Sequence, residues 1–209
     1  MRIRPSNIMK ALKGNEIGSV ATEYALIVPF FLLLAFGMIE TGRIMMVNSH
    51  LEGAITQATR ITVTGTIPDG YEDMQSYIKA YLKNSLDAVG AGDDIIMTMK
   101  LYDSFANVGK PEPIIDDKNG NGTCDSGDKY TDVNGNKSWD SDMGADGTGG
   151  EENIMLMDVS INLKLLFADF VPAFVVDGRD YIPLSASTVV RNEPFGGTTW
   201  TPGTKVRPC

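Results

Sequence analysis

Cysteine and histidine are scarce in this chain of 209 residues, and their scarcity limits the chemistry it can perform. It has two cysteines, Cys124 and Cys209, and one histidine, His50. Two cysteines are too few for a disulfide framework, but in an oxidising compartment they could pair and tie the C-terminus to the central loop; the sequence leaves this open. His50 has no Ser, Cys or paired acid at a readable spacing. We therefore expect a solvent-facing helix residue and no enzyme.

Basic residues are also few, and their placement argues against nucleic-acid binding. The formal net charge is −9; four basic residues and one acidic residue occupy the first eighteen positions, whereas aspartate dominates residues 112–152. No basic patch with interleaved aromatic residues occurs. The glycine-rich run 147–150 lacks the lysine and the helix of a phosphate loop, so we expect no small-molecule substrate. A basic start followed by an acidic remainder favours a cytoplasmic N-terminus and an exported body.

Long apolar runs are limited to one, which begins shortly after the basic start. Tyr24 to Ile39 is 16 residues, short of the ~20 that a membrane-spanning helix needs. Extending the run back to Ile17 gives the required length but places Glu23 inside it, where a carboxylate is costly. A cleaved secretory signal needs small residues after the run, and residues 39–43 lack them. A plain signal-anchor helix remains an alternative.

Helical periodicity continues beyond the apolar run and predicts one unbroken helix from about Ser19 to Thr64. Apolar residues recur at spacings of three and four, which places them on one face of a helix. They are Ile44, Val47, Leu51, Ala54, Ile55, Ala58 and Ile61. Such a helix would be about 70 Å long at 1.5 Å per residue. We expect half of it to lie in lipid and half to form the spine of a domain.

The rest of the chain predicts a small α+β domain. Asp69 and Glu72 resemble a capping box ahead of an amphipathic helix over 70–88. Alternating apolar residues predict strands near 95–101, 155–165 and 182–190, while Pro172 makes the apolar segment 167–176 a connection or a helix. The predicted fold class is therefore α+β, with a long transmembrane and spine helix packed on a small antiparallel sheet.

An insertion rich in Asp, Asn and Gly separates the first strand from the second and carries a predicted calcium loop. Carboxylate and amide oxygens at alternate positions, with glycine at the sharp turn, are what a Ca²⁺ ion of six to eight ligands requires. The candidate ligands of this first loop are Asp117, Asn119, Asn121, Thr123, Asp125 and Asp128. A disordered surface insertion is the alternative.

A second copy of the calcium pattern begins fifteen residues later. Its candidate ligands are Asp132, Asn134, Asn136, Ser138, Asp140 and Asp142. It departs from the pattern at Lys137, where glycine is expected, and at Met143, where an acid should close the loop; we expect Asp142 to substitute. The Asp-x-Asn-x-Asn runs resemble the calcium repeats of dockerin and thrombospondin type 3 modules. The metal would be structural, ordering a loop that lacks its own core.

The N-terminal residues carry the most specific resemblance. Gly18, Glu23-Tyr24, Pro29, the run Gly37 to Arg43 and the helix end Ala54 to Arg60 resemble a TadE-like pseudopilin of the tight-adherence (Flp-type) pilus system. Residues 187–194 agree weakly. The resemblance covers mainly residues 14–64. It implies cleavage between Gly18 and Ser19 by a prepilin peptidase, after which Glu23 would pair with the new N-terminal amine of a neighbouring subunit.

The resemblance also implies a domain plan and a set of partners. Residues 1–18 would be a cytoplasmic leader, 19–41 a transmembrane helix, 42–105 a periplasmic spine helix with a second helix and first strand, 106–152 the calcium-binding insertion and 153–209 the last strands. The expected partners are the peptidase, other pilins and the inner-membrane assembly platform, for a minor pilin in the biogenesis of adhesive pili. An uncleaved, TadG-like, membrane-tethered calcium-binding surface protein is the alternative.

Overall fold

The computed structural model describes residues 16–91, 94–175, 177–193 and 199–209. These residues form two compact units. The first contains the described residues up to Met45 together with Leu165–Asp180, and the second contains Met46–Lys164 together with Tyr181–Cys209. Most of the predicted leader lies outside the described residues.

The first helix, α2, runs from Glu16 to Thr64 without interruption. The predicted continuous helix is confirmed, and its backbone begins three residues earlier than expected. Pro29 lies inside it. Its surface changes along its length: the large side chains from Val20 to Ile39, Phe36 excepted, are exposed, while Val47, Leu51 and Ala58 are fully buried. Helix α2 therefore contributes an exposed apolar surface to the first unit and a buried apolar stripe to the second.

The second helix, α3, spans Met74–Asp87 and is shorter at its start than the predicted range of 70–88. The expected capping box at Asp69 and Glu72 is wrong. Asp73 is the N-cap, and its Oδ1 accepts a hydrogen bond of 2.6 Å from the Ser76 N–H. A side chain at this position satisfies a backbone donor that the first turn leaves free.

Four antiparallel strands form the larger sheet, in the order β4-β1-β5-β6. They are β1 (Ile95–Tyr102), β4 (Ala145–Asp146), β5 (Ile154–Lys164) and β6 (Tyr181–Arg191). Three of them match the predicted strands. The short β4 comes from the insertion and pairs with the end of β1, through Lys100 and Leu101. The predicted α+β class, a long apolar helix with antiparallel strands, is confirmed.

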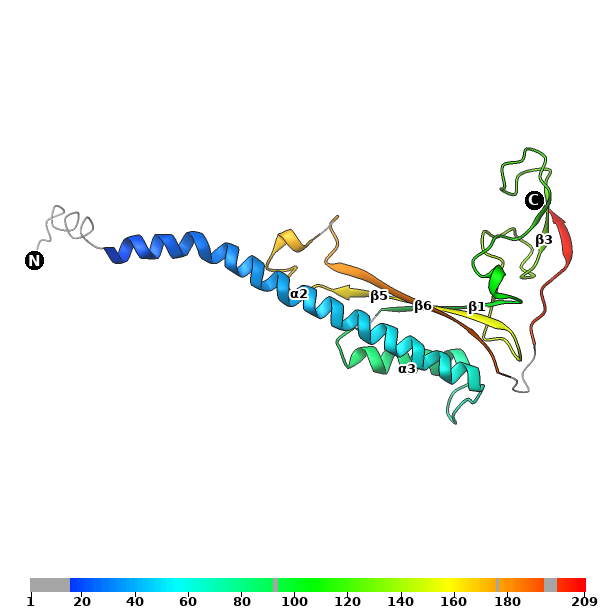
Figure 1. The fold of residues 1–209 in the computed structure, drawn as a ribbon, viewed down its shortest axis with the longest axis horizontal. Coiled ribbons are helices and arrows are strands. Elements are labelled where there is room, and N and C mark those ends of the chain that lie inside the picture. Colours follow the sequence, from blue (N-terminus) through cyan, green and yellow to red (C-terminus); the bar gives the residue numbers. More distant parts are fainter. Residues whose placement is uncertain (1–15, 92–93, 176, 194–198) are drawn as a thin grey trace, which may run out of the picture. The chain divides into compact units, whose positions relative to one another are not determined.

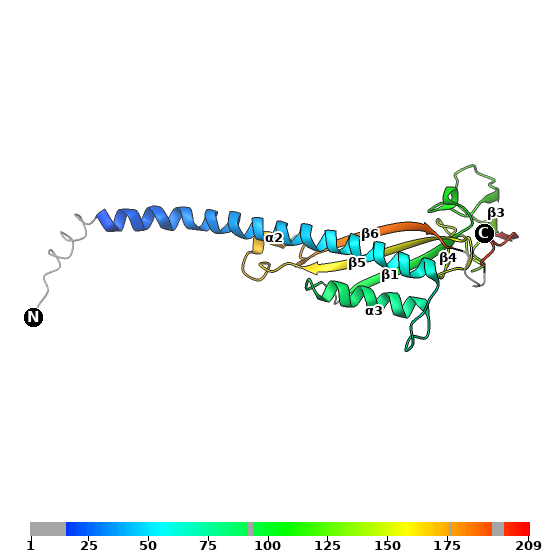
Figure 2. The same cartoon turned by 60° about the horizontal axis from the view of Figure 1, so that its bottom comes forward.

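The core of the second unit lies between the helices and one face of this sheet. Figures 1 and 2 show the part of α2 after Met46, together with α3, running along the sheet. Alternate residues of β5 turn toward the helices because successive side chains in a strand point to opposite faces. The buried members are Val47, Leu51, Ala54, Ile55, Ala58, Met74, Ile78, Leu82, Leu86, Met99, Leu101, Met155, Met157, Val159, Ile161 and Leu163.

A smaller sheet organises the insertion. It consists of β2 (Ile114–Asp116), β3 (Lys129–Asp132) and β7 (Lys205–Pro208), in the order β2-β3-β7. Two short 3₁₀ turns, η1 (Phe105–Asn107) and η2 (Pro172–Phe174), complete the described elements. The expectation that the insertion lacks a core is wrong. Val133 and Met143 are buried in one cluster with Tyr102 and Ile154 of the larger sheet.

Candidate functional site

The expected processing residues lie at the start of α2. Gly18 and Ser19 have helical backbone in its first turn. Glu23 and Tyr24 lie just over a turn further on, and both are exposed, Tyr24 at 65%. The structure thus places all four residues together on one helical segment, directly before the exposed apolar stretch.

Within α2, the segment Val20–Val63 is long and apolar enough to be a candidate membrane span. It is the one candidate span among the described residues, and only 6% of its most apolar window is buried. Exposed side chains of this kind are costly in water and favourable in lipid. The exposed set is Val20, Tyr24, Leu26, Ile27, Val28, Phe30, Phe31, Leu32, Leu33, Leu34, Met38 and Ile39.

The first predicted calcium loop, residues 117–128, is a tight, hydrogen-bonded turn. The two carboxylate oxygens of Asp117 accept hydrogen bonds from the N–H groups of Gly120 at 2.7 Å and Gly122 at 2.9 Å. Both glycines have positive φ, 70° and 74°, a conformation that glycine adopts without strain. The backbone bond from Gly122 is the largest of several that lower the pKa of Asp117. The loop therefore holds an ionised carboxylate at its first position.

Asp125 gathers the amide side chains of the same loop. Its Oδ2 accepts hydrogen bonds from the Nδ2 groups of Asn119 at 3.0 Å and Asn121 at 2.6 Å. These bonds, with Asn119 the largest contributor, lower the pKa of Asp125. The Oδ1 of Asn121 accepts from both the N–H and the hydroxyl of Thr123, each at 2.8 Å. Four of the six expected ligands are thus linked to one another by these bonds.

Asp128 closes the first loop from within. Its Oδ1 accepts from the Lys118 N–H at 3.1 Å and its Oδ2 from the Asp125 N–H at 3.0 Å. These donors are the second and ninth residues of the loop. Asp128 is only 2% exposed. Its buried carboxylate therefore holds the second and ninth residues of the loop together.

The second loop, residues 132–143, repeats this arrangement. The Oδ1 of Asp132 accepts from the Gly135 N–H at 2.8 Å. The Nδ2 groups of Asn134 and Asn136 donate to Asp140 Oδ2 at 2.7 and 2.6 Å. The Ser138 N–H donates to Asn136 Oδ1 at 2.8 Å. Lys137, the departure from the expected glycine, takes a positive φ of 72°.

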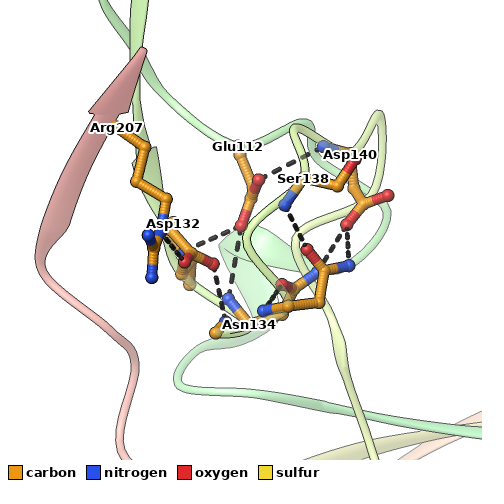
Figure 3. A network of polar contacts seen from close by, with 9 residues as sticks. Glu112, Asp132, Asn134, Ser138, Asp140 and Arg207 are labelled. Carbon is orange, nitrogen blue, oxygen red and sulfur yellow. Dashed lines mark hydrogen bonds and ion pairs between the residues drawn. The ribbon is translucent and has the colours of Figure 1, made fainter. Parts of the chain in front are cut away.

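Glu112 closes the second loop, and the sequence reasoning missed it. Its Oε1 accepts from the Val133 N–H at 2.7 Å and the Asn134 N–H at 3.3 Å, and its Oε2 accepts from the Asp140 N–H at 3.2 Å. Val133 and Asp140 are the second and ninth residues of this loop, so Glu112 takes the position that Asp128 holds in the first. Figure 3 shows its side chain between Asp132 and Asp140. It is 1% exposed.

Asp142, which was expected to close the second loop, is bonded instead to two residues of β1. Its two oxygens accept hydrogen bonds from Lys100 Nζ at 2.7 Å and the Tyr102 hydroxyl at 2.8 Å. Burial raises its pKa, but the bonds from Lys100 and Tyr102 outweigh this and leave the pKa lowered. Burial, followed by the bond to Asp142, raises the pKa of Tyr102. Asp142 therefore attaches the insertion to β1.

Strand β7 ties both loops to the last residues of the sequence. The Arg207 guanidinium forms an ion pair with Asp132, whose side chain is 1% exposed (Figure 3). A disulfide joins Cys124 of the first loop to Cys209, with 5.5 Å between the Cα atoms. The second loop is thus attached to β7 by an ion pair, and the first loop to the residue directly after β7 by a disulfide.

The side chains do not form a ready metal centre. Within the described ranges, no three His, Cys, Asp or Glu side chains are grouped as they would be to hold a metal ion. Each network is instead completed by asparagine amides that donate to Asp125 or Asp140. The oxygens that the pattern predicts are gathered in each loop, Asp142 excepted, but they are satisfied by the protein's own N–H groups.

The exposed apolar helix, its continuation into a packed domain and the antiparallel sheet define a class: α+β proteins with one candidate N-terminal membrane span. Residues 18–60 match the model of the TadE family, described as TadE-like protein. This N-terminal part of the chain is therefore similar to TadE-like proteins. The match begins at Gly18 and ends at Arg60, within α2. Comparisons with curated proteins and with solved structures gave no match.

Proposed function

We propose that this chain is a pseudopilin, or minor pilin, that is cut after Gly18 by a prepilin peptidase and acts in the assembly of adhesive Flp-type pili. The single observation that carries the proposal is the two-part helix α2. Its first part exposes apolar side chains and its later part buries a stripe in the domain. A subunit of a helical filament needs both surfaces: one leaves the bilayer to pack against neighbouring subunits, and the other holds the domain.

Its partners would be the peptidase, other pilins and the inner-membrane assembly platform, with the folded domain outside the cytoplasm. The disulfide between Cys124 and Cys209 supports an oxidising location for the domain. Glu23 lies at the edge of the apolar stretch, where an unpaired charge is costly and a paired one is tolerable. A positive amine from a neighbouring subunit would supply that pair. We propose no catalytic role for the chain.

Processing is tested by the mass and N-terminal sequence of the protein recovered from membranes. Cleavage predicts Ser19 as the first residue, whereas the alternative, an uncleaved TadG-like surface protein, predicts Met1. Gly18→Leu should leave only the precursor, because a side chain at this position obstructs the peptidase. Gly37→Leu is the matched control, since a Cβ added at Gly37 meets no atom within 4 Å. Wild-type protein that begins at Met1 would refute cleavage.

Assembly is tested separately from cleavage with Glu23. Glu23→Ala should be processed normally but should fail to enter or initiate filaments, because the charge that pairs with the amine is lost. Glu52→Ala, an exposed glutamate in the later part of the same helix, is the control and should leave filaments unchanged. Filaments are counted by electron microscopy of sheared cells. Normal filaments from Glu23→Ala would contradict this role.

We also propose that the two loops bind structural Ca²⁺, with Glu112 in place of Asp142 as the acid of the second. The repeated placement of a closing carboxylate, Asp128 in one loop and Glu112 in the other, supports this. A bound cation would compete with the asparagine amide groups that donate hydrogen bonds to Asp125 and Asp140. We therefore expect weak affinity, in the range of about 10⁻⁴–10⁻³ M typical of extracellular modules.

Calcium binding is tested by calorimetry on the full chain in detergent. The wild type should release heat over the millimolar range, and Asp125→Ala should lose the contribution of the first loop. Asp177→Ala is the control, because Asp177 is an exposed aspartate outside both loops. Absence of binding up to several millimolar Ca²⁺ would remove the metal from the proposal and leave the pilin role untouched.

A further inference from the structure

We propose that the segment Leu165–Val175, called here the apolar loop, lies in the membrane–water interface beside α2 and contacts lipid. The inference rests on the membrane anchor of the proposed function and adds a second lipid-contacting element to it. The apolar loop is part of the connection from β5 to β6 and belongs to the same compact unit as the exposed apolar part of α2. Figures 1 and 2 both show it alongside that helix.

The surface of the apolar loop is unusual for a water-exposed connection. Of its eleven residues, Asp169 is the only charged one and no other is polar. Phe170 is 81% exposed, Leu166 51% and Val175 36%. Loops on soluble surfaces are normally polar, and a contiguous exposed apolar patch marks a contact with a partner or a membrane. The apolar loop exposes three large apolar side chains within ten residues.

Two contacts fix the apolar loop at a defined level of α2. The rings of Phe36 and Phe167 stack with their centroids 4.6 Å apart and their planes 20° from parallel. One turn later, Glu40 Oε2 accepts a hydrogen bond of 3.0 Å from the Leu166 N–H. Phe36 lies inside the apolar run and Glu40 directly follows it. The loop is therefore attached at the end of the run.

The position along α2 at which the apolar loop is attached indicates whether its exposed side chains contact lipid or another protein. Phe36 lies three residues before the last apolar residue of the run, Ile39, which corresponds to about 5 Å along the helix. Amphipathic segments at a membrane surface bury their apolar side about 5–10 Å deep. If the exposed run of α2 is in lipid, Phe167 is at this depth, and Phe170 and Leu166 on the same short loop are near it. Continuity with the lipid-facing surface of α2 thus favours lipid over another protein.

The polar groups of the apolar loop are compatible with this environment. Its backbone is tied in turns: the Val171 N–H donates to the Phe167 carbonyl at 2.8 Å, and the Phe174 N–H donates to the Val171 carbonyl at 2.9 Å. Such bonds reduce the cost of placing irregular backbone near hydrocarbon. Glu40, 5% exposed, also accepts from Arg43 at 3.1 Å. Its charge is paired, and Asp169 is exposed and can face the headgroups.

Quenching of tryptophan by brominated lipid tests the apolar loop. The full chain is reconstituted in phosphatidylcholine–phosphatidylglycerol vesicles, with or without bromine on the acyl chains. Phe170→Trp places the probe on the loop. Phe31→Trp reports the anchor, and Phe105→Trp is the matched control, because Phe105 is 59% exposed on η1 of the other unit. The wild-type signal of Trp139 and Trp200 is subtracted.

We expect Phe31→Trp to be strongly quenched, Phe170→Trp to show at least half of that quenching, and Phe105→Trp to show none. If Phe31→Trp is unquenched, the anchor itself is refuted and the loop proposal falls with it. If Phe31→Trp is quenched but Phe170→Trp matches Phe105→Trp, the loop proposal alone is overturned. In that case, shielding of Phe170→Trp from aqueous acrylamide would assign the patch to a second copy of the chain.

Discussion

The two loops of the insertion reach nearly the same hydrogen-bonding pattern by different means. In the first loop, Asp128 lies inside the repeat, ten residues from Lys118 and three from Asp125. In the second, Glu112 lies 21 residues from Val133 and 28 from Asp140. A buried carboxylate that accepts the N–H groups of the second and ninth residues is therefore what both loops require. The carboxylate can come from inside the loop, as Asp128 does, or from a residue distant in sequence, as Glu112 does.

The loops also differ in how deeply they are set. Asn119, Asn121 and Asp125 of the first loop are exposed, whereas Asp132 of the second is buried against Arg207. The first loop depends on its own short-range bonds and on a disulfide. The second depends on distant residues and on the cluster around Val133. We therefore expect each substitution described below to destabilise one loop more than the other.

Removal of the disulfide should have the largest effect and should fall on the first loop. The disulfide joins residues 85 positions apart in the sequence, for which chain entropy predicts a stabilisation of about 4.6 kcal/mol. Cys124→Ser with Cys209→Ser should lower the free energy of unfolding by about this amount in urea. Hydrogen exchange should increase most over 117–128. Equal increases over 132–140 would show that the two loops open as one unit.

Glu112→Ala should have the next largest effect and should act on the second loop. It leaves three N–H donors without their acceptor, and buried unsatisfied donors cost about 1–3 kcal/mol each before relaxation. We expect a loss of about 3 kcal/mol in the free energy of unfolding. Asp128→Ala, which frees two donors, is the matched variant and should cost about 2 kcal/mol. A larger loss of stability from Asp128→Ala than from Glu112→Ala would contradict the conclusion that the second loop is the more deeply buried of the two.

Arg207→Ala should cost about 2 kcal/mol, because the buried Asp132 carboxylate loses its cationic partner but keeps the hydrogen bond from the Gly135 N–H. It should also change the response to pH. Burial raises the pKa of Asp132, but the bonds from Arg207 and from the Lys137 and Gly135 N–H groups together outweigh it, and the pKa is lowered. This stabilisation is present above the unfolded pKa, near 4, and is lost as pH falls through the lower folded value. The wild type should therefore gain stability as the pH rises from below the folded pKa of Asp132 to about 4. Arg207→Ala should lose part of that gain, and an unchanged profile would contradict the role of Arg207.

Asp142→Asn should have the smallest effect. It weakens the half-exposed pair with Lys100 and the bond from Tyr102, together worth about 1 kcal/mol. Because Asp142 attaches the insertion to β1 and does not close the second loop, Ca²⁺ binding should be unchanged. Weaker calcium binding by Asp142→Asn, with Glu112→Gln unaffected, would restore Asp142 to the loop.

Local patterns predicted the elements whose partners are close in sequence or whose apolar periodicity is strong. Helix α2, strands β1, β5 and β6, and the turn of the first loop all follow from spacing alone. Strand β7 could not be predicted in this way, because Lys205 to Pro208 shows no apolar alternation. Its structure depends on pairing with β3. The two-residue β4 is likewise defined only by its neighbour β1.

The role of Glu112 was missed because a single upstream glutamate has no spacing that links it to the second loop. One signal was present: Glu112 stands between Pro111 and Pro113, and prolines on both sides restrict the backbone around it. The failure of the second repeat at Met143 showed that an acid was needed. Only the fold shows which one is within reach.

The position of the closing acids has a kinetic consequence. Contacts over ten residues can form in about 10–100 ns, and the entropic cost of closing a loop rises with its length. The first loop can therefore form early, as soon as its own twelve residues are free to turn. The second requires Glu112 from upstream and Arg207, 75 residues beyond Asp132. It should be among the last parts of the domain to become ordered, after β7 has paired with β3.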